Sequence, residues 1–416
     1  MSGFTSFEPL LSNPKFAIFD FAPGETHSLS TEDAKKTARR LIEVLIVHCL
    51  DKLGFDSSYN PPIDRELHSD LASWAAESVI PLCGDDESKT RDVTAAIRNA
   101  AVVSDYLYPH ADAESRMHMA RVTLAGIALD DFAGHDEAGQ FGSYVYDLLM
   151  GKDMAQDGGW LGMFTRVTRD YMAHFGEADP RAGALGGAVL FHYISSLETE
   201  RRFGGSLDTV PPHLRPSAPS GIRENDTTRS SHGCCPKGFP RWHRAQSGGS
   251  AAYVAALFHR VPFDYWITGL APLLRFTDLV NDLMSFSKEL LGSTAGGEMD
   301  INYVTLQTLV RRQAGTPSRF GSSRRELWTY RDSLCEMMDE IVQAVCEADK
   351  AFVEYPRHCD EHQRHLWNMD QAARAWTSYK NGFVKMHIDA PRWGTEALRA
   401  AVRDKDAWAM LKGEIS

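Results

Sequence analysis

Apolar residues recur at intervals of three or four positions along most of the chain, which is the spacing of a helix buried on one face. The segment 35–53 shows this spacing clearly. Ser30 and Thr31 precede it as candidate N-caps, and Glu32 and Asp33 would lie in the first turn. Strand-like alternation is scarce, and no internal repeat is evident, so the pattern predicts an all-α fold. Further helices are expected near residues 65–82, 88–106, 115–130, 139–150, 160–175, 181–202, 250–260, 264–290, 302–312, 322–354 and 361–387.

One segment breaks this pattern. Residues 204–240 are rich in Pro, Gly, Ser and charged side chains, so they cannot supply an apolar face for packing. A loop of this length is unusual inside a compact domain. We expect a disordered insertion or a surface lid there, and a retained intron is an alternative that a transcript would test. The chain is otherwise expected to form one α-helical domain over residues 1–416, with a flexible N-terminus at about 1–28.

The run NDLMSFSKE lies in the predicted helix 264–290 and places three oxygen donors at steps of four residues. Asn281, Ser285 and Glu289 therefore project from one helical face. An amide oxygen, a hydroxyl and a carboxylate suit a hard cation such as Mg²⁺, which prefers oxygen ligands and often completes its shell with phosphates. The spacing therefore suggests a metal ion that holds a phosphorylated ligand.

A second group of oxygen donors ends the apolar segment 115–130. Asp130 and Asp131 follow a largely apolar run, and Asp136 and Glu137 lie just beyond. Adjacent carboxylates at the mouth of an apolar interior repel each other unless one is protonated or a cation lies between them. Taken alone, the DD pair could simply be a solvated helix end. The oxygen donors of NDLMSFSKE make metal binding the favoured interpretation.

An apolar helix that ends in LDD, followed about 150 positions later by NDLMSFSKE, resembles the class I terpene cyclases. It most resembles the fungal sesquiterpene cyclases of the trichodiene synthase and longiborneol synthase type, over roughly residues 40–395. The resemblance implies an all-α class I terpenoid synthase helical bundle with a central active-site cavity. It also implies three Mg²⁺ ions around a prenyl diphosphate. The implied metal ligands are Asp130, Asp131, Asn281, Ser285 and Glu289.

A third motif, RAQSG, fits the same family. Arg244 resembles the diphosphate-sensing arginine, and Ser247 and Gly248 resemble the linker and effector residues at a helix break. A guanidinium offers a fixed fork of donors to phosphate oxygens. Glycines at 248 and 249 can bend a helix and expose a carbonyl group. The resemblance also assigns Lys288 to the diphosphate.

The chain departs from the family pattern in two places. The aspartate-rich motif usually reads DDxxD or DDxxE, whereas this chain reads DDFAGHD, so Asp136 is displaced. The family also carries an Arg-Tyr pair six and seven residues after a tryptophan near the C-terminus. Counted from Trp376, these positions hold Gly382 and Phe383. Candidate replacements for the pair are Lys380, Lys385 and Arg392.

An apolar pocket for a carbocation needs aromatic faces. The resemblance favours Phe191 and Trp376 as pocket walls, and the histidines are expected to be ordinary surface or core residues. The aromatic candidates considered are Trp74, Tyr106, Phe191, Tyr193, Trp266, Trp376 and Phe383.

Charge and composition exclude several classes of protein. The 416 residues carry a net charge of −12, and an acidic chain without a basic patch is a poor nucleic-acid binder. Neither an apolar run of 18 residues nor a signal-peptide pattern is seen, so no membrane contact is expected. The seven scattered cysteines suggest a reducing cytoplasm. Zinc ligation by His232, Cys234, Cys235 and His243 is disfavoured because their spacing fits no known finger.

These observations predict a sesquiterpene cyclase that converts farnesyl diphosphate to a C15 terpene with release of diphosphate, with a longiborneol-like product as the first hypothesis. One alternative is a chain-elongating prenyltransferase, although that class carries two aspartate-rich motifs. Another is a catalytically degenerate helical protein that binds a prenyl diphosphate or a partner. Homodimerisation is common among such cyclases and is left open.

Overall fold

The computed structural model describes residues 6–25, 29–132, 135–153, 158–204, 238–296, 302–323, 326–390 and 395–414. The expected insertion at 204–240 falls almost wholly outside these ranges. Within them the chain is helical, with a single isolated bridge between Pro317 and Leu327, and the all-α prediction is confirmed.

The helices of the first half are α1 (Glu8–Leu11), η1 (Pro14–Phe19), α2 (Glu32–Lys52), α3 (Arg65–Ser78), η3 (Ile80–Cys83), α4 (Glu87–Leu107), α5 (Ala113–Phe132), α6 (His135–Leu149), α7 (Trp160–Ala178) and α8 (Pro180–Gly204). Those of the second half are α9 (Phe239–Ser247), α10 (Ser250–Leu257), α11 (Phe263–Trp266), η5 (Ile267–Gly269), α12 (Leu270–Gly296), α13 (Tyr303–Gln313), α14 (Tyr330–Asp349), η6 (Lys350–Glu354), η7 (Tyr355–His358), α15 (Glu361–Leu366), α16 (Met369–Asp389), α17 (Glu396–Arg403) and α18 (Lys405–Gly413).

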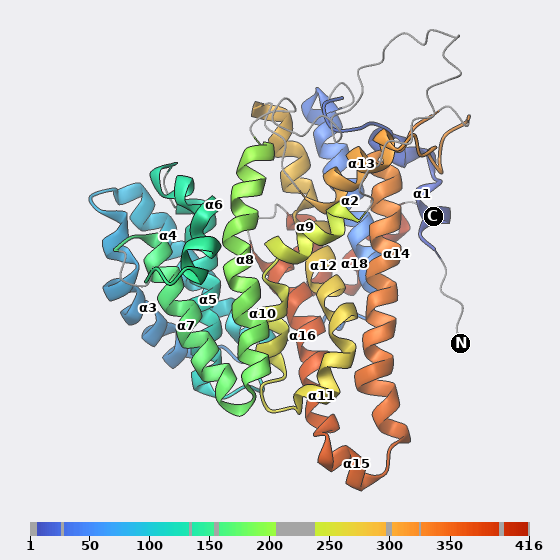
Figure 1. The fold of residues 1–416 in the computed structure, drawn as a ribbon. Coiled ribbons are helices and arrows are strands. Elements are labelled where there is room, and N and C mark those ends of the chain that lie inside the picture. The colour runs from blue at the N-terminus through green and yellow to red at the C-terminus, as the bar shows by residue number, and fades with distance from the viewer. Residues whose placement is uncertain are drawn as a thin grey trace, which may run out of the picture.

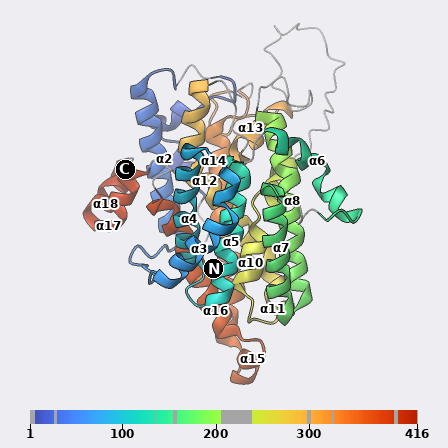
Figure 2. The same ribbon diagram turned by 90° about the vertical axis from the view of Figure 1, so that its left-hand side faces the viewer.

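The long helices form a bundle whose axes run in broadly similar directions (Figure 1). Helices α4, α5, α7 and α8 pack in sequence on one side, and α12 packs against α14, α16 and α10 on the other. Figure 2 shows α17 and α18 on the outside of the bundle, where they pack against α2. Helix α15 extends beyond the bundle at one end (Figure 1).

Local chemistry explains where two of these helices begin. The Thr31 hydroxyl accepts from the backbone N–H of Ala34 at 3.1 Å, so Thr31 rather than Ser30 is the N-cap of α2. At α14, the backbone N–H and hydroxyl of Thr329 both donate to the Asp332 carboxylate, at 2.9 and 2.8 Å. The predicted helix 322–354 was therefore wrong at its start, because this cap sets the first helical residue at Tyr330.

The predicted helix 361–387 is two helices. α15 ends at Leu366, and Asn368 adopts a left-handed conformation with φ of 50° before α16 begins at Met369. Asparagine tolerates this conformation better than most residues. The short helix α9 and the C-terminal helices α17 and α18 were not predicted.

The N-terminal segment, residues 6–25, packs against the rest of the bundle. Phe7, Phe16 and Phe19 are buried. The Asp339 carboxylate of α14 accepts from the backbone N–H of Phe7 at 2.8 Å and from the Ser6 hydroxyl at 2.6 Å. Burial of three phenylalanines offsets part of the entropic cost of ordering this segment.

Candidate functional site

A cavity of about 620 Å³ opens between α4, α5, α8, α10, α12 and α16. Its volume falls in the range of roughly 300–1,000 Å³ that is typical of small-molecule sites. One part of its wall is apolar, and the other carries carboxylates, amides and two cations. The apolar lining residues include Val102, Val103, Leu107, Val122, Ile127, Leu190, Leu197 and Met386.

Three helices bring their C-terminal ends to the polar part of the cavity. Asp130 and Asp131 lie near the end of α5, Glu200 near the end of α8, and Glu289 in the last turns of α12. The C-terminal end of a helix already carries partial negative charge, so carboxylates there are unfavourable unless a cation is close. This arrangement fits a site for divalent cations. The side chains of Asp136 and Glu137 lie outside what the structure describes.

The Asn/Ser/Glu triad is divided between the cavity and the core. Asn281 and Glu289 line the cavity, whereas Ser285 is fully buried and is not among the lining residues. The Ser285 hydroxyl donates to the backbone carbonyl of Asp282 at 3.4 Å. Glu289 accepts from the Asn302 amide at 2.7 Å, which orients its carboxylate.

His387 of α16 contacts the triad across the cavity, and no sequence motif pointed to it. Its Nε2 lies 3.1 Å from Asn281 Oδ1, and its Nδ1 lies 2.7 Å from the Phe383 carbonyl oxygen. An imidazole between two acceptor oxygens restrains the Asn281 side chain. The expectation that all histidines are ordinary surface or core residues therefore does not describe this one.

Arg244 and Lys288 line the same cavity, near the carboxylates. Arg244 Nε lies 2.9 Å from Asp282 Oδ1, and its Nη1 donates to the Ser247 hydroxyl at 3.3 Å. Burial opposes the charge of this guanidinium, but Asp282 and Asp278 outweigh it and raise the pKa of Arg244. Arg244 is therefore a permanently charged donor at the cavity wall, held in place by an aspartate of α12.

A helix break separates α9 from α10 at the cavity. Gly249 adopts φ of +61°, which glycine reaches without strain, and Gly248 packs so closely that a Cβ on it would lie 2.2 Å from Asp278 Oδ1. Ser247, Gly248 and Gly249 all line the cavity. The structure thus shows a break at the position that the RAQSG motif indicated.

Asp278 is a buried cavity residue that the sequence reasoning missed. Burial raises the pKa of its carboxyl to about 7, with the Asp282 charge adding to the effect and Arg244 opposing it. Its Oδ1 has no hydrogen-bond partner in the described part of the chain. Its position offered a signal, because Asp278 precedes Asn281 by three residues and Asp282 by four and so shares their helical face.

The two favoured wall residues do not line the cavity. Trp376 is fully buried, and its indole N–H donates to Asp349 Oδ1 at 2.7 Å. Phe191 packs on Tyr144, with ring centroids 6.2 Å apart. Phe191 faces away from the cavity because helical periodicity presents another side of α8 to it, whereas Trp376 lies about two turns before Phe383, the first residue of α16 that lines the cavity. The aromatic lining residues are Tyr106, Phe164, Tyr193, Tyr253 and Phe383.

Every tyrosine of this wall has a partner for its hydroxyl group. Tyr106 donates to Asp389 at 2.9 Å and Tyr193 to the Gly126 carbonyl at 3.4 Å. The Tyr253 hydroxyl bonds to the Thr123 hydroxyl at 2.9 Å. Because each hydroxyl group is hydrogen-bonded, these rings contribute their aromatic faces to the cavity wall.

Gly382 and Phe383 occupy the positions where the terpene cyclase pattern has an Arg-Tyr pair, and both serve helix packing or the cavity wall instead. A Cβ on Gly382 would lie 1.9 Å from the Tyr106 carbonyl oxygen, so α16 and the end of α4 leave no room for a side chain. Phe383 lines the cavity. Of the candidate replacements, Lys380 pairs with Asp349 at 3.3 Å and Lys385 with Asp389 at 3.2 Å, and Arg392 lies outside the described residues.

Comparison with solved structures identifies the class of fold. The linalool/nerolidol synthase of Streptomyces clavuligerus, solved in complex with 2-fluorogeranyl diphosphate, aligns with a TM-score of 0.50 and 15% identity, over 81% of this chain and 99% of that one. A single-residue variant of cucumene synthase aligns with a TM-score of 0.50 and 12% identity, over 81% of this chain and 100% of that one. The chain therefore has the all-α fold of the terpene synthases.

The particular family within that fold rests on the motifs alone. No protein-family model matches the sequence, and no curated protein matches it. The solved neighbours do not confirm the fungal trichodiene synthase and longiborneol synthase type. Among the described helices, none is both long enough and apolar enough to cross a membrane.

Proposed function

We propose that the protein is a class I terpene synthase that ionises and cyclises farnesyl diphosphate. The observation that carries the proposal is the division of one cavity into a polar end, with carboxylates, Arg244 and Lys288, and an apolar remainder. A prenyl diphosphate has the same division, with a charged head and a hydrocarbon tail. The neighbour from Streptomyces clavuligerus was solved with a fluorinated member of this ligand class.

The polar end fits Mg²⁺ because oxygen donors outnumber cations there. Asp130, Asp131, Asn281 and Glu289 would hold the ions. Ser285 would have to exchange its bond to the Asp282 carbonyl for the metal, which requires a change of rotamer. When bound, Mg²⁺ would neutralise the charge of the diphosphate and so favour its departure.

The protein's own groups complete the ionisation. Arg244 and Lys288 would donate hydrogen bonds to the diphosphate oxygens as the C1–O bond breaks and its electron pair stays on oxygen. Asp282 holds the Arg244 guanidinium in position before substrate binds. Ser247 and Gly248, at the helix break, would direct a carbonyl dipole at the developing cation.

The apolar wall would then control the carbocation. The aliphatic lining excludes water, which would otherwise quench the cation. The faces of Tyr193, Tyr253 and Phe383 would stabilise its positive charge, since an aromatic ring carries negative charge on its face. Attack by a substrate double bond closes a ring, and loss of a proton or capture of water ends the reaction. The product is set by the contour of the cavity, with a longiborneol-like terpene as the first hypothesis.

The test is incubation of the purified protein with farnesyl diphosphate, with and without Mg²⁺, followed by gas chromatography–mass spectrometry of the organic extract. A Mg²⁺-dependent C15 hydrocarbon or alcohol is expected. A longer prenyl diphosphate formed only when isopentenyl diphosphate is added would instead indicate chain elongation. Binding of farnesyl diphosphate without turnover, with geranyl and geranylgeranyl diphosphates also inert, would support the degenerate protein.

Two substitutions test the metal ligands. Asn281→Ala and Glu289→Ala should each lower kcat/KM at least about 100-fold, or roughly 2.7 kcal/mol, with little change in thermal unfolding temperature. Glu361→Ala, at an exposed position of α15, is the control and should leave turnover unchanged. Wild-type turnover in both cavity variants would overturn the metal assignment.

A further inference from the structure

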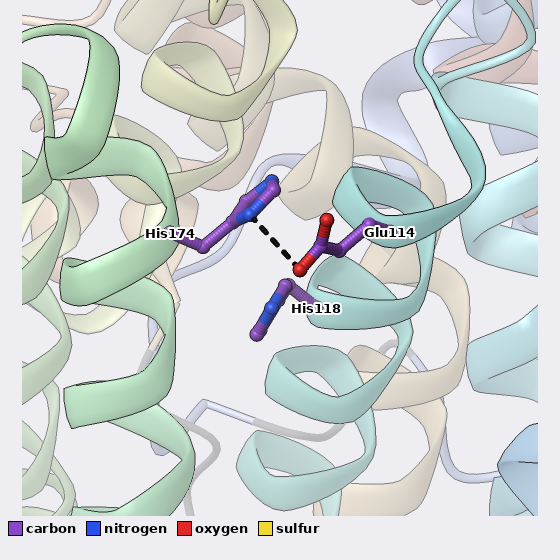
Figure 3. A group of neighbouring side chains, drawn as sticks. All are labelled: Glu114, His118 and His174. Atoms are coloured by element: carbon purple, nitrogen blue, oxygen red, sulfur yellow. Dashed lines mark ion pairs between the residues drawn. The ribbon is translucent and has the colours of Figure 1, made fainter.

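A second group of potential metal ligands lies away from the cavity. Glu114 and His118 on α5 and His174 on α7 place one ligand atom each within 4.8 Å of one another. Figure 3 shows the Glu114 carboxylate and the His174 ring directed towards each other, with the His118 ring beside them. Asp130 lies sixteen residues further along α5, or about 24 Å at 1.5 Å per residue. The two sites are therefore at opposite ends of one helix.

The spacing on α5 is that of a chelating pair. Glu114 and His118 are four residues apart on this helix. Residues at this spacing share a helical face. Helices α5 and α7 pack against each other, and this packing brings His174 to the Glu114–His118 pair.

A buried serine orients one of the imidazoles. The Ser115 hydroxyl, which is almost fully buried, lies 2.9 Å from His174 Nε2. His174 Nδ1 is thereby directed at Glu114 Oε1, at 3.7 Å. A hydrogen bond to the second ring nitrogen is the usual device that sets the tautomer of a metal-binding histidine.

The neighbouring rings keep this arrangement in place. The His118 and His174 rings stack with centroids 4.5 Å apart, and His259 stacks on His174 at 5.1 Å. Three imidazoles so close together are unfavourable when charged. The His118 ring thus lies close enough to His174 for both imidazoles to reach one ion.

We propose that Glu114, His118 and His174 form a site for a borderline divalent cation, with Zn²⁺ as the best-fitting ion. Two imidazoles and one carboxylate are a set of three protein ligands that zinc takes, with water in the fourth position. Bonds of 2.0–2.1 Å would bring the ligand atoms to about 3.3 Å from one another, so these atoms, which now lie within 4.8 Å, have to close by up to about 1.5 Å. Glu114 can move readily, because its side chain is 76% exposed.

The ligand atoms of this site differ from those of the cavity, and so does the metal ion that each site favours. Mg²⁺ prefers oxygen ligands, as the cavity offers, whereas imidazole favours zinc and its neighbours in the transition series. A bound ion would join α5 to α7 and stabilise the folded chain by mass action. This inference does not depend on the proposed synthase activity.

Isothermal titration of the metal-free full-length chain with Zn²⁺ tests the proposal. Cys234→Ser/Cys235→Ser is the background, because adjacent thiols bind zinc as well. One ion per chain is expected to bind, with the affinity lowered at least about tenfold by Glu114→Gln, by His118→Ala or by His174→Ala. Glu114→Gln preserves side-chain volume at an exposed position, so the test does not depend on whether the histidine variants fold.

Two control variants and one absorption spectrum test whether Zn²⁺ binds at this site rather than elsewhere on the chain. His362→Ala on the exposed helix α15 and Glu289→Ala in the cavity should both retain the Zn²⁺ affinity of the background. Co²⁺ should give the visible absorption of a tetrahedral nitrogen and oxygen site, and the signal should be lost in Glu114→Gln. Absence of Zn²⁺ binding, unchanged affinity in the α5 and α7 variants, or a thiolate-to-cobalt absorption band would each overturn the proposal.

Discussion

At the scale of the single residue, the buried carboxyl group of Asp278 is expected to make the free energy of unfolding depend on pH. Burial raises its pKa from the ordinary 3.8 to about 7. A folded pKa above the unfolded value means that the folded chain binds the extra proton. The stability that the folded chain gains from this proton is therefore complete below about pH 4 and is lost as the pH rises through about 7.

Asp278→Asn should remove this dependence. The neutral amide does not titrate, so the variant should gain stability relative to the wild type as the pH rises from 4.5 to 8. The relative gain should be on the order of a few kcal/mol. Urea unfolding in the presence of a chelator measures it, and Asp85→Asn at an exposed position should follow the wild type. A difference between Asp278→Asn and the wild type that does not vary with pH would contradict the prediction.

At the scale of the element, close packing between helices depends on glycine at several positions, of which Gly248 and Gly382 are two. Gly248 leaves space for the Asp278 carboxylate at the break between α9 and α10, and Gly382 lets α16 approach the last residues of α4. At Gly382 the obstacle is a backbone carbonyl, which cannot move aside as a side chain can. The family's Arg-Tyr pair has no room at this point of α16.

Gly382→Ala should destabilise the protein by about 3 kcal/mol, because the new methyl group forces α16 away from α4. Chemical denaturation gives the free energy of unfolding. Gly413→Ala, in the last turn of α18, is the matched control, since a Cβ there meets nothing within 4 Å. Equal stability of the two variants would show that the contact between α16 and α4 adjusts freely.

At the scale of the whole molecule, the polar residues that line the cavity belong to helices far apart in the sequence. α5, α9 and α12 contribute Asp130, Arg244 and Glu289 to one cavity, so a ligand that engages all three stabilises their mutual packing. This consequence is measurable without turnover.

Mg²⁺ and inorganic diphosphate together should raise the unfolding temperature by a few degrees. Ligand at 100-fold its Kd adds about 2.7 kcal/mol to the free energy of unfolding. Differential scanning calorimetry should show a smaller effect with either component alone, and Asn281→Ala should remove most of the joint effect. The same shift in the presence of a chelator would show that the diphosphate binds without metal.

The sequence by itself determined the helical class and the polar residues of α12. Period-3.6 patterning is local, so it is legible without tertiary structure, and so is the i, i+4, i+8 spacing of Asn281, Ser285 and Glu289. The Thr31 cap and the glycine-containing break after Arg244 are local in the same sense. They depend on hydrogen bonds and backbone angles within a few residues.

Tertiary structure decided what no local signal carries. Packing buried Trp376 in the core, placed Phe191 against Tyr144, and put Tyr193 and Phe383 on the cavity wall. All four are aromatic, so only the tertiary structure selects which of them line the cavity. Contact across the bundle brought His387 to Asn281, and it brought His174 of α7 to Glu114 and His118 of α5. These partners are separated by tens of residues or more, and the forces that join them arise only once the chain has folded.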